Sequence, residues 1–282
     1  MFGALAERVY FSVTRDEATT VLTAAGEAGD DAFPLLEAAI ACAIHDFPFR
    51  ETEPVRVLAR NAADRLAERT GEGPEEALAE TLSGDLRLNG DLLSYDDPDN
   101  TDIIAVAERR RGLSAVLAIF YLDAARRAGL KASAVDFPGH VLLRVETPDG
   151  PVALDPFSQG RLVMPSELTR RALRAGLTPH VADRLDLLMA PVSDRMALIR
   201  LQNILFARAL RIGDYEGAER SALRRALLDP EDHRPWLDVA AAREKQGALT
   251  GALDALSRAR SLDGPAEVGR QQTLERVRLQ LN

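Results

Sequence analysis

The last third of the chain repeats itself with a period of 34 residues, and this feature constrains the fold more than any other. A shift of 34 superposes Gly213 on Gly247 and Ala218 on Ala252. A period of this length indicates one pair of antiparallel helices per unit, with small residues where the helices approach closely. Two units rarely form a stable stack by themselves. We therefore expect them to pack on the preceding part of the chain and on a final helix near 265–281.

The period is that of the tetratricopeptide repeat, whose arrays commonly present a concave binding surface. The sequence thus predicts a C-terminal α-helical repeat of this type over 195–282. Its aromatic residues Phe206, Tyr215 and Trp236 fall at positions that normally pack between helices. We expect them in the core, which leaves the concave face as the candidate surface for a protein partner.

The remaining part, 1–190, has the pattern of a mixed α+β domain. Apolar residues recur at spacings of three and four in the first ~90 residues, as at Phe33 and Leu36, and again over about 102–128, where Gly129 ends the pattern. This periodicity predicts helices.

An antiparallel hairpin follows these helices. Residues 140–146 alternate in polarity, the segment 147–150 (Thr-Pro-Asp-Gly) is a strong turn signal, and a strand resumes at 152–154. Pairing of the two residues that flank the turn places His140 and Asp155 two positions apart on one face. We therefore expect these two side chains to be within reach of each other.

Ser114 is the third member of this candidate site, because it is expected to open the apolar helix that follows Gly112. Backbone N–H groups are unpaired at a helix N-terminus, and the helix dipole there favours negative charge. A hydroxyl at that place, facing a histidine that an aspartate holds, is the arrangement of nucleophile, general base and orienting acid.

The order of nucleophile at a helix start, histidine on a strand and aspartate on the next strand resembles the transglutaminase-like, papain-related superfamily. Four segments more narrowly resemble its bacterial SirB-type family: 95–101, 109–113, 138–144 and 155–161. The resemblance implies a papain/transglutaminase-like core of helices plus a small antiparallel sheet, followed by tetratricopeptide repeats. It also implies binding roles for residues within these segments, namely Asn100, Arg111, Gly139 and Phe157.

The chain departs from the active members at Ser114, where they carry cysteine. A thiol ionises readily beside a histidine, whereas a hydroxyl stays protonated until the base acts in the transition state. The preferred hypothesis is therefore a noncatalytic or weakly catalytic transglutaminase-like protein that binds a protein or peptide, through the helical repeat or the cleft. In that case Ser114 caps its helix, and His140 and Asp155 are a vestigial pair that fixes the hairpin.

Two alternatives remain. The first is an acyl-transfer or amide-hydrolysing enzyme in which Ser114 is the nucleophile, His140 the general base and Asp155 the group that orients it. The second is an adaptor in which only the helical repeat matters.

Two further clusters have structural explanations. Cys42 and His45 lie three apart and could form a dyad, but Cys42 sits in an apolar stripe, which favours a core position. The acidic stretch 96–102 lacks the spacing of a calcium-binding loop. It is better explained as a turn in which Asn100 or Thr101 caps the next helix, whose end is marked by the arginines of 109–111.

The overall charge narrows the range of partners. The formal net charge is −9, which argues against binding to nucleic-acid phosphates. The single cysteine excludes a disulfide framework, and neither a signal peptide nor a membrane-spanning run is evident. We expect a cytoplasmic protein without cofactor or metal, which binds neither nucleic acid nor membrane.

Overall fold

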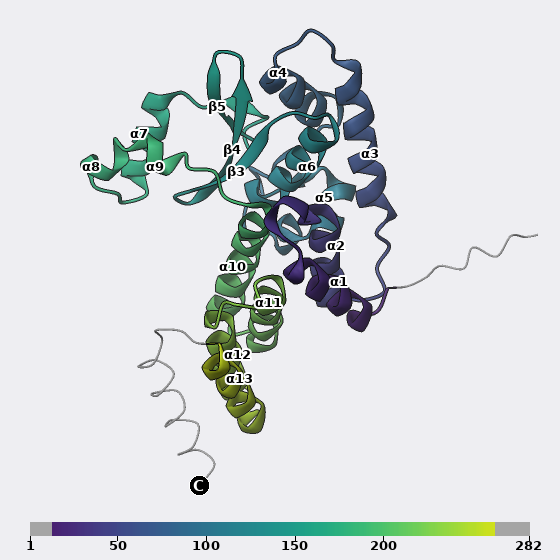
Figure 1. The fold of residues 1–282 in the computed structure, drawn as a ribbon, viewed down its shortest axis with the longest axis vertical. Helices are drawn as coiled ribbons and strands as arrows, with labels where there is room; N and C mark the ends of the chain where they lie inside the picture. Colours follow the sequence, from purple (N-terminus) through teal and green to yellow (C-terminus); the bar gives the residue numbers. More distant parts are fainter. Residues whose placement is uncertain (1–12, 263–282) are drawn as a thin grey trace, which may run out of the picture.

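The computed structural model, which describes residues 13–262, consists of a helical core around a small sheet and four further helices that extend away from it (Figure 1). A capping box of Thr14 and Glu17 begins the first helix, and Pro74 occupies the first turn of the fourth. The predicted N-terminal helical region is thus present. Its helices are α1 (Arg15–Glu27), α2 (Leu35–Asp46), α3 (Glu53–Glu68) and α4 (Pro74–Ala79), which continues as a π-helical turn (Glu80–Asp85).

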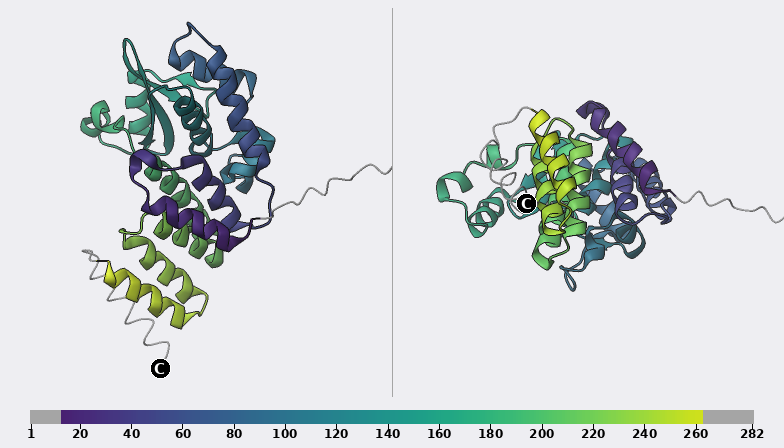
Figure 2. Two further views of the ribbon diagram at one scale, coloured as in Figure 1. Left: turned by 45° about the vertical axis from the view of Figure 1, so that its right-hand side comes forward. Right: turned by 90° about the horizontal axis from the view of Figure 1, so that it is seen from below.

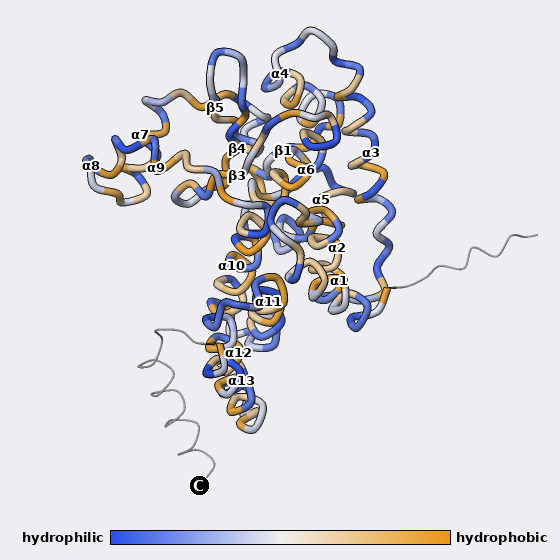
Figure 3. Tube along the Cα trace, in the orientation of Figure 1, coloured by the Kyte–Doolittle hydropathy of each residue, from blue (hydrophilic) through white to orange (hydrophobic). Residues whose placement is uncertain are grey.

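The central helix of the core is α6 (Ser114–Arg127). It is buried almost all round, between the sheet on one side and α2, α3, α5 (Ile103–Arg109) and α10 (Asp194–Ile212) on the others. The preceding α5 ends because Arg110 adopts a left-handed conformation, with φ of 60°. The short strand β2 (Arg111–Gly112), which pairs in parallel with β1 (Asn89–Gly90), then leads into α6. In Figure 3 apolar stretches lie where α2, α5 and α6 meet, whereas the loop between α3 and α4 is largely hydrophilic.

The main sheet is a four-stranded antiparallel meander in the order β3-β4-β5-β6. Pro138 and Gly139 form the turn between its first two strands, where Gly139 has a φ of 75°. Thr147 pairs with Gly150, which confirms the predicted register of the second hairpin. The strands are β3 (Ala132–Phe137), β4 (His140–Thr147), β5 (Gly150–Asp155) and β6 (Arg161–Leu162).

Both faces of this sheet are covered. Leu143 and Val145 point into the core around α6, whereas Phe137 and Leu142 belong to a second apolar cluster on the opposite face. Three short helices supply the other side of that cluster: α7 (Pro165–Arg174), α8 (Pro179–Ala182) and α9 (Leu185–Leu188). The buried Leu142, which interrupts the polar side of the predicted alternation, is explained by this second layer.

The last four described helices form two antiparallel pairs (Figure 2). Gly213 and Gly247 end the first helix of each pair with the same φ of 76°, and Ala218 and Ala252 are both fully buried. The 34-residue spacing seen in the sequence is therefore a spacing of equivalent structural positions. The helices are α10 (Asp194–Ile212), α11 (Tyr215–Leu228), α12 (Arg234–Lys245) and α13 (Leu249–Ser261). The helix expected near 265–281 lies outside the described residues.

The aromatic residues of these pairs are packed but only half-buried. Phe206 and Trp236 contact the apolar clusters between the helices. The guanidinium of Arg225 lies 4.5 Å from the ring centre of Phe206, and that of Arg258 lies 5.2 Å from that of Trp236. Each ring thus has an arginine guanidinium over it at cation–π distance.

The first helix pair is docked on the N-terminal region. Gly26 lies so close to α11 that a Cβ there would overlap the carbonyl oxygen of Leu227. Arg195 donates hydrogen bonds to the carbonyl oxygens of Gly26, Ala28 and Leu228 and forms an ion pair with Asp30. These contacts join segments separated by most of the chain. The domain boundary expected between 190 and 195 falls just before α10.

Candidate functional site

The three residues singled out as a triad lie at the ends of neighbouring elements. Ser114 is the first residue of α6, His140 the first of β4 and Asp155 the last of β5. His140 and Asp155 share the sheet face that carries Leu142, as the paired register requires. The predicted proximity of these two side chains is confirmed, because Nε2 of His140 lies 2.7 Å from Oδ1 of Asp155.

Asp155 is the most strongly held of the three. Its side chain is 1% exposed, and it accepts hydrogen bonds from the backbone N–H groups of Phe157 and Ser158, from the Ser158 hydroxyl and from Arg171. Burial alone would raise its pKa, but the His140 hydrogen bond and then the Arg171 guanidinium outweigh burial and hold the pKa well below its ordinary value. Asp155 is therefore a carboxylate at neutral pH.

Arg171 is the functional residue that the sequence did not reveal. It extends from α7 and donates to Asp155 at 2.8 Å, while Glu167, one turn earlier on the same helix, accepts from it at 2.8 Å. Hydrogen bonds from Arg161 and Arg171 lower the pKa of Glu167 to about 2. The spacing of Glu167 and Arg171 is the only sequence signal for this network, and such i,i+4 pairs are common on helix surfaces.

Ser114 is not a helix cap. The N-cap of α6 is Leu113, which makes no side-chain capping bond, and Ser114 begins the helix itself. The Ser114 Oγ instead accepts a hydrogen bond from the backbone N–H of Val141, at 3.2 Å. The capping interpretation is therefore wrong, because the hydroxyl points toward β4. Ser114 is 8% exposed, and no hydrogen bond among the described residues joins it to His140.

One aromatic ring contacts the histidine, and a second ring packs against the first. The ring centre of Phe157 lies 5.9 Å from that of His140 and 5.8 Å from that of Tyr95, both in edge-to-face geometry. A side chain at position 90 would collide with Phe157, so Gly90 permits this arrangement. Phe157, assigned to binding from the sequence, thus contacts the His140–Asp155 pair directly.

The other residues assigned to binding occupy different places. Asn100 is fully buried, donates to the carbonyl oxygen of Ser94 and accepts the N–H of Leu113 through its backbone oxygen. It ties the preceding loop to the start of α6. Gly139 lies in the exposed turn next to His140, and Arg111 is exposed on β2.

Tyr121 is a further polar group close to Asp155. It is fully buried on α6, and its hydroxyl has no hydrogen-bond partner. Burial and the nearby negative charge of Asp155 raise its pKa above the ordinary value, so the phenol stays neutral. A Cβ added at Gly160 would lie 2.8 Å from this hydroxyl, which places Tyr121 against the turn that follows Asp155.

The acidic stretch is a framework of caps and ion pairs. Asp102, and not Asn100 or Thr101, is the N-cap of α5, and its Oδ1 accepts from the N–H groups of Ile104 and Ala105. This corrects the expected cap by one or two residues. Arg109 forms ion pairs with Asp91, Asp97 and Asp99. In the described part of the chain, no group of three or more His, Cys, Asp or Glu side chains is arranged so that it could hold a metal ion.

Cys42 belongs to the core, as expected from its apolar surroundings. It is buried, and burial raises the pKa of its thiol to about 12. His45 is also buried, and burial followed by the charge of Arg224 lowers its pKa to about 4. Both groups are neutral at pH 7, whereas a reactive dyad needs a thiolate.

With this fold and this His–Asp pair, the chain belongs to the transglutaminase-like superfamily, whose family model matches residues 52–203. The chain is 30% identical over 240 residues to a "UPF0162 protein" of Xylella fastidiosa strain Temecula1, across 81% of this chain and 84% of that protein. A "UPF0162 protein" of strain 9a5c is 29% identical over 236 residues, with the same coverage.

A solved structure offers a more distant likeness. The crystal structure of menin that reveals the binding site for the Mixed Lineage Leukemia protein superposes with a TM-score of 0.43 at 11% identity, over 87% of this chain and 69% of menin. This likeness is too remote to bear on function. Between residues 13 and 262, no helix is long and apolar enough to cross a membrane.

Proposed function

We propose that this chain is a noncatalytic or weakly catalytic transglutaminase-like protein that binds a protein or peptide partner in the cytoplasm. The observation that most supports this proposal is the environment of Ser114. A hydroxyl stands where active members carry a thiol, it is 8% exposed, and it accepts the N–H of Val141. We further propose membership of the SirB-type family and assign the two C-terminal helix pairs to the tetratricopeptide type.

The chemistry of nucleophilic attack supports this proposal. A serine nucleophile needs a base in hydrogen-bond contact and an open path to the substrate. Ser114 has neither a described hydrogen bond to His140 nor substantial exposure. The His140–Asp155 pair has a structural task instead, because Asp155 also fixes the turn after β5 through the N–H groups of Phe157 and Ser158.

Exposed apolar side chains near the site favour a macromolecular partner. Leu92 and Leu93 are 81% and 93% exposed and belong to the same loop as Tyr95, which contacts Phe157. Ile212, at the end of the first helix of the C-terminal pairs, is also largely exposed. Large apolar groups that remain open to water are typical of interaction surfaces.

A covalent probe tests whether Ser114 reacts. The full chain is treated with a fluorophosphonate, beside Ser114→Ala and His140→Ala variants, and labelling is located by peptide mass spectrometry. We expect no labelling at Ser114 in the unaltered protein. Labelling that disappears in both variants, while circular dichroism shows them folded, would refute the noncatalytic proposal.

Binding is tested by photo-crosslinking in the full chain. A photoreactive residue replaces Leu93 or Ile212, and Glu68, on the distant α3, serves as the matched exposed control. We expect the photoreactive residue at position 93 or 212 to form a discrete cross-linked adduct with the partner. This adduct should persist when the Ser114→Ala substitution is added. An adduct that depends on the Ser114 hydroxyl would contradict the proposal, and adducts from Ile212 alone would favour an adaptor that acts through the helix pairs.

One observation favours a second candidate, an acyl-transfer or amide-hydrolysing enzyme. The His140–Asp155 hydrogen bond is formed at 2.7 Å and the histidine is 20% exposed. In this candidate Ser114 attacks, His140 takes its proton and Asp155 holds the imidazole. The fluorophosphonate experiment decides between the two candidates, because only the enzyme requires labelling that His140→Ala abolishes.

A further inference from the structure

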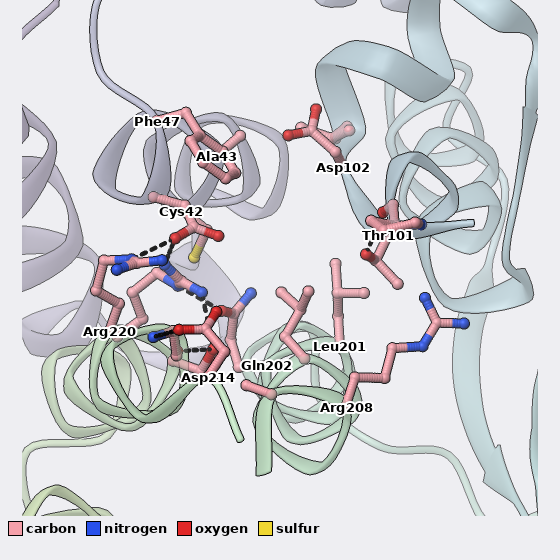
Figure 4. Close-up of a pocket in the computed structure, with 18 of the residues that line it drawn as sticks. Cys42, Ala43, Phe47, Thr101, Asp102, Leu201, Gln202, Arg208, Asp214 and Arg220 are labelled. Atoms are coloured by element: carbon pink, nitrogen blue, oxygen red, sulfur yellow. Dashed lines mark hydrogen bonds and ion pairs between the residues drawn. The ribbon is translucent and has the colours of Figure 1, made fainter. Parts of the chain in front are cut away.

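A cavity lies away from the His140 site, between the core and the first C-terminal helix pair. Helices α2, α10 and α11 and the start of α5 enclose it, and its volume is about 250 Å³ (Figure 4). Neither Ser114, His140 nor Asp155 lines it. Its walls are mainly apolar, formed by Ala39, Cys42, Ala43, Phe47, Leu201 and Leu205.

Two buried donors at one end of this cavity lack hydrogen-bond partners. Arg224 and Gln202 are each 1% exposed, and Arg224 Nε donates to Gln202 Oε1 at 2.6 Å. This bond fixes the orientation of the amide, so that its Nε2 is a donor and points toward the cavity in Figure 4. Gln202 Nε2 has no hydrogen-bond partner, and Arg224 Nη1 makes no hydrogen bond but only a 3.5 Å ion pair with Asp46. Buried donors without acceptors are costly, and a ligand oxygen would satisfy both.

Three arginines act at this end of the cavity, Arg15, Arg220 and Arg224, against the two carboxylates of Asp46 and Asp214. Arg220 and Arg224 share one carboxylate, that of Asp46, at 2.6 and 3.5 Å. The buried His45 beside them has a pKa lowered to about 4, first by burial and then by Arg224 and Arg15, against the effect of Asp46. The local field therefore favours an added negative charge.

Of the carboxylates of Asp102 and Asp214, which also line the cavity, only that of Asp102 has an ion-pair partner among the described residues. Asp102 binds Arg50, and Asp214 caps α11 by accepting the N–H of Gly217. At the far end of the cavity Arg208 and Arg211 lie 3.8 and 3.7 Å from Asp96, and Arg208 also donates to the carbonyl oxygen of Tyr95. Two arginines thus share one carboxylate at each end, but only the Gln202–Arg224 end also carries buried donors without a hydrogen-bond partner.

We propose that this cavity binds a small monocarboxylate with an apolar body. The carboxylate accepts from Gln202 Nε2 and Arg224 Nη1, and the body lies along the apolar walls. A single negative charge matches the single surplus charge, whereas a dianion would bring an uncompensated charge into an apolar space. The volume corresponds to about eight water molecules at roughly 30 Å³ each, which suits about eight non-hydrogen atoms, as in hexanoate.

Calorimetric titration of the full chain with hexanoate tests this proposal, with hexanamide as the neutral ligand of the same shape. We expect hexanoate to bind at least tenfold more tightly than hexanamide, because bonds to charged groups are the stronger ones. Gln202→Glu keeps the acceptor for Arg224 but replaces the free donor by a negative oxygen. This variant should lose at least tenfold in hexanoate affinity and keep its thermal stability.

The control variant is Arg211→Gln, which removes a cation from the lining at the far, exposed end. It should bind hexanoate as the unaltered protein does. Equal affinities for hexanoate and hexanamide, an unchanged affinity in Gln202→Glu, or no binding at millimolar hexanoate would each overturn the proposal.

The only cysteine of the chain gives an independent readout. Cys42 lines the cavity, so bound hexanoate should slow its alkylation by N-ethylmaleimide at least severalfold, and an unchanged rate at saturating ligand would place the binding elsewhere and overturn the proposal. A peptide that ends in leucine presents the same chemistry through its terminal carboxylate. Tighter binding of this peptide than of hexanoate would identify a chain end as the source of the carboxylate, and weaker binding would identify a free acid.

Discussion

The buried His45 should make this protein sensitive to mild acid. Its imidazole is 5% exposed, its Nδ1 has no hydrogen-bond partner, and its pKa is lowered to about 4 by burial and then by Arg224 and Arg15. The unfolded chain binds a proton at this residue near pH 6.5. The folded state resists that proton, so the stability present above pH 6.5 is lost as the pH falls toward 4.

The size of the effect follows from the difference between the two pKa values. Each pH unit between them changes the free energy of unfolding by about 1.4 kcal/mol. The loss is about 2 kcal/mol at pH 5 and reaches about 3 kcal/mol at pH 4. Carboxylates whose pKa is lowered, such as Asp155 and Glu167, stay ionised above pH 5, so the window from pH 7 to 5 reports mainly on His45.

Urea unfolding at pH 7, 6 and 5 measures this effect. The comparison is between the unaltered protein, His45→Leu, and a control at the exposed His180 (His180→Gln). Between pH 7 and pH 5, we expect the free energy of unfolding of His45→Leu to fall by about 2 kcal/mol less than that of the unaltered protein. At pH 7 this variant should be no less stable, because it removes an unpaired buried nitrogen. Parallel pH profiles for all three proteins would refute the reasoning.

Three further predictions concern packing and charge. Asp155→Asn should lower the free energy of unfolding at pH 7 by about 3 kcal/mol, since it removes the buried negative charge that His140 and Arg171 share; a loss below 1 kcal/mol in urea would contradict this. Gly26→Ala should cost about 2 kcal/mol through its collision with α11, whereas Gly29→Ala, which meets no neighbour, should be neutral in the same assay. Cys42 should be alkylated at pH 8 at least a hundredfold more slowly in the folded than in the denatured protein; equal rates would show an accessible thiolate.

The part of the site that was predictable depends on local chemistry. The turn signal at 147–150 fixes the strand register, and the register alone brings His140 to Asp155. The start of α6 at Ser114 followed from the glycine before it and the apolar run after it. Such features involve residues that are close in sequence or related by a strict period, so one chain carries enough information for them.

The rest depends on tertiary packing. Arg171 reaches Asp155 only because α7 folds over the sheet, and no local pattern states where a helix will lie. The Gln202–Arg224 pair likewise joins two helices at positions 22 residues apart. Ser114 was expected to cap its helix because serine commonly does so. The nearby N–H of Val141 takes its hydroxyl instead, which no propensity can indicate.

The contact between Gly26 and α11 has a consequence for the order in which the protein is made. The partner of α1 is synthesised about 200 residues later, which takes roughly 10 to 40 s at ribosomal rates of 5–20 residues per second. Throughout that interval the surface of α1 against which α11 later packs is not covered by α11. A nascent chain of this protein should therefore depend on the ribosome-associated chaperones until α11 emerges, and slow codons before residue 228 would lengthen that dependence.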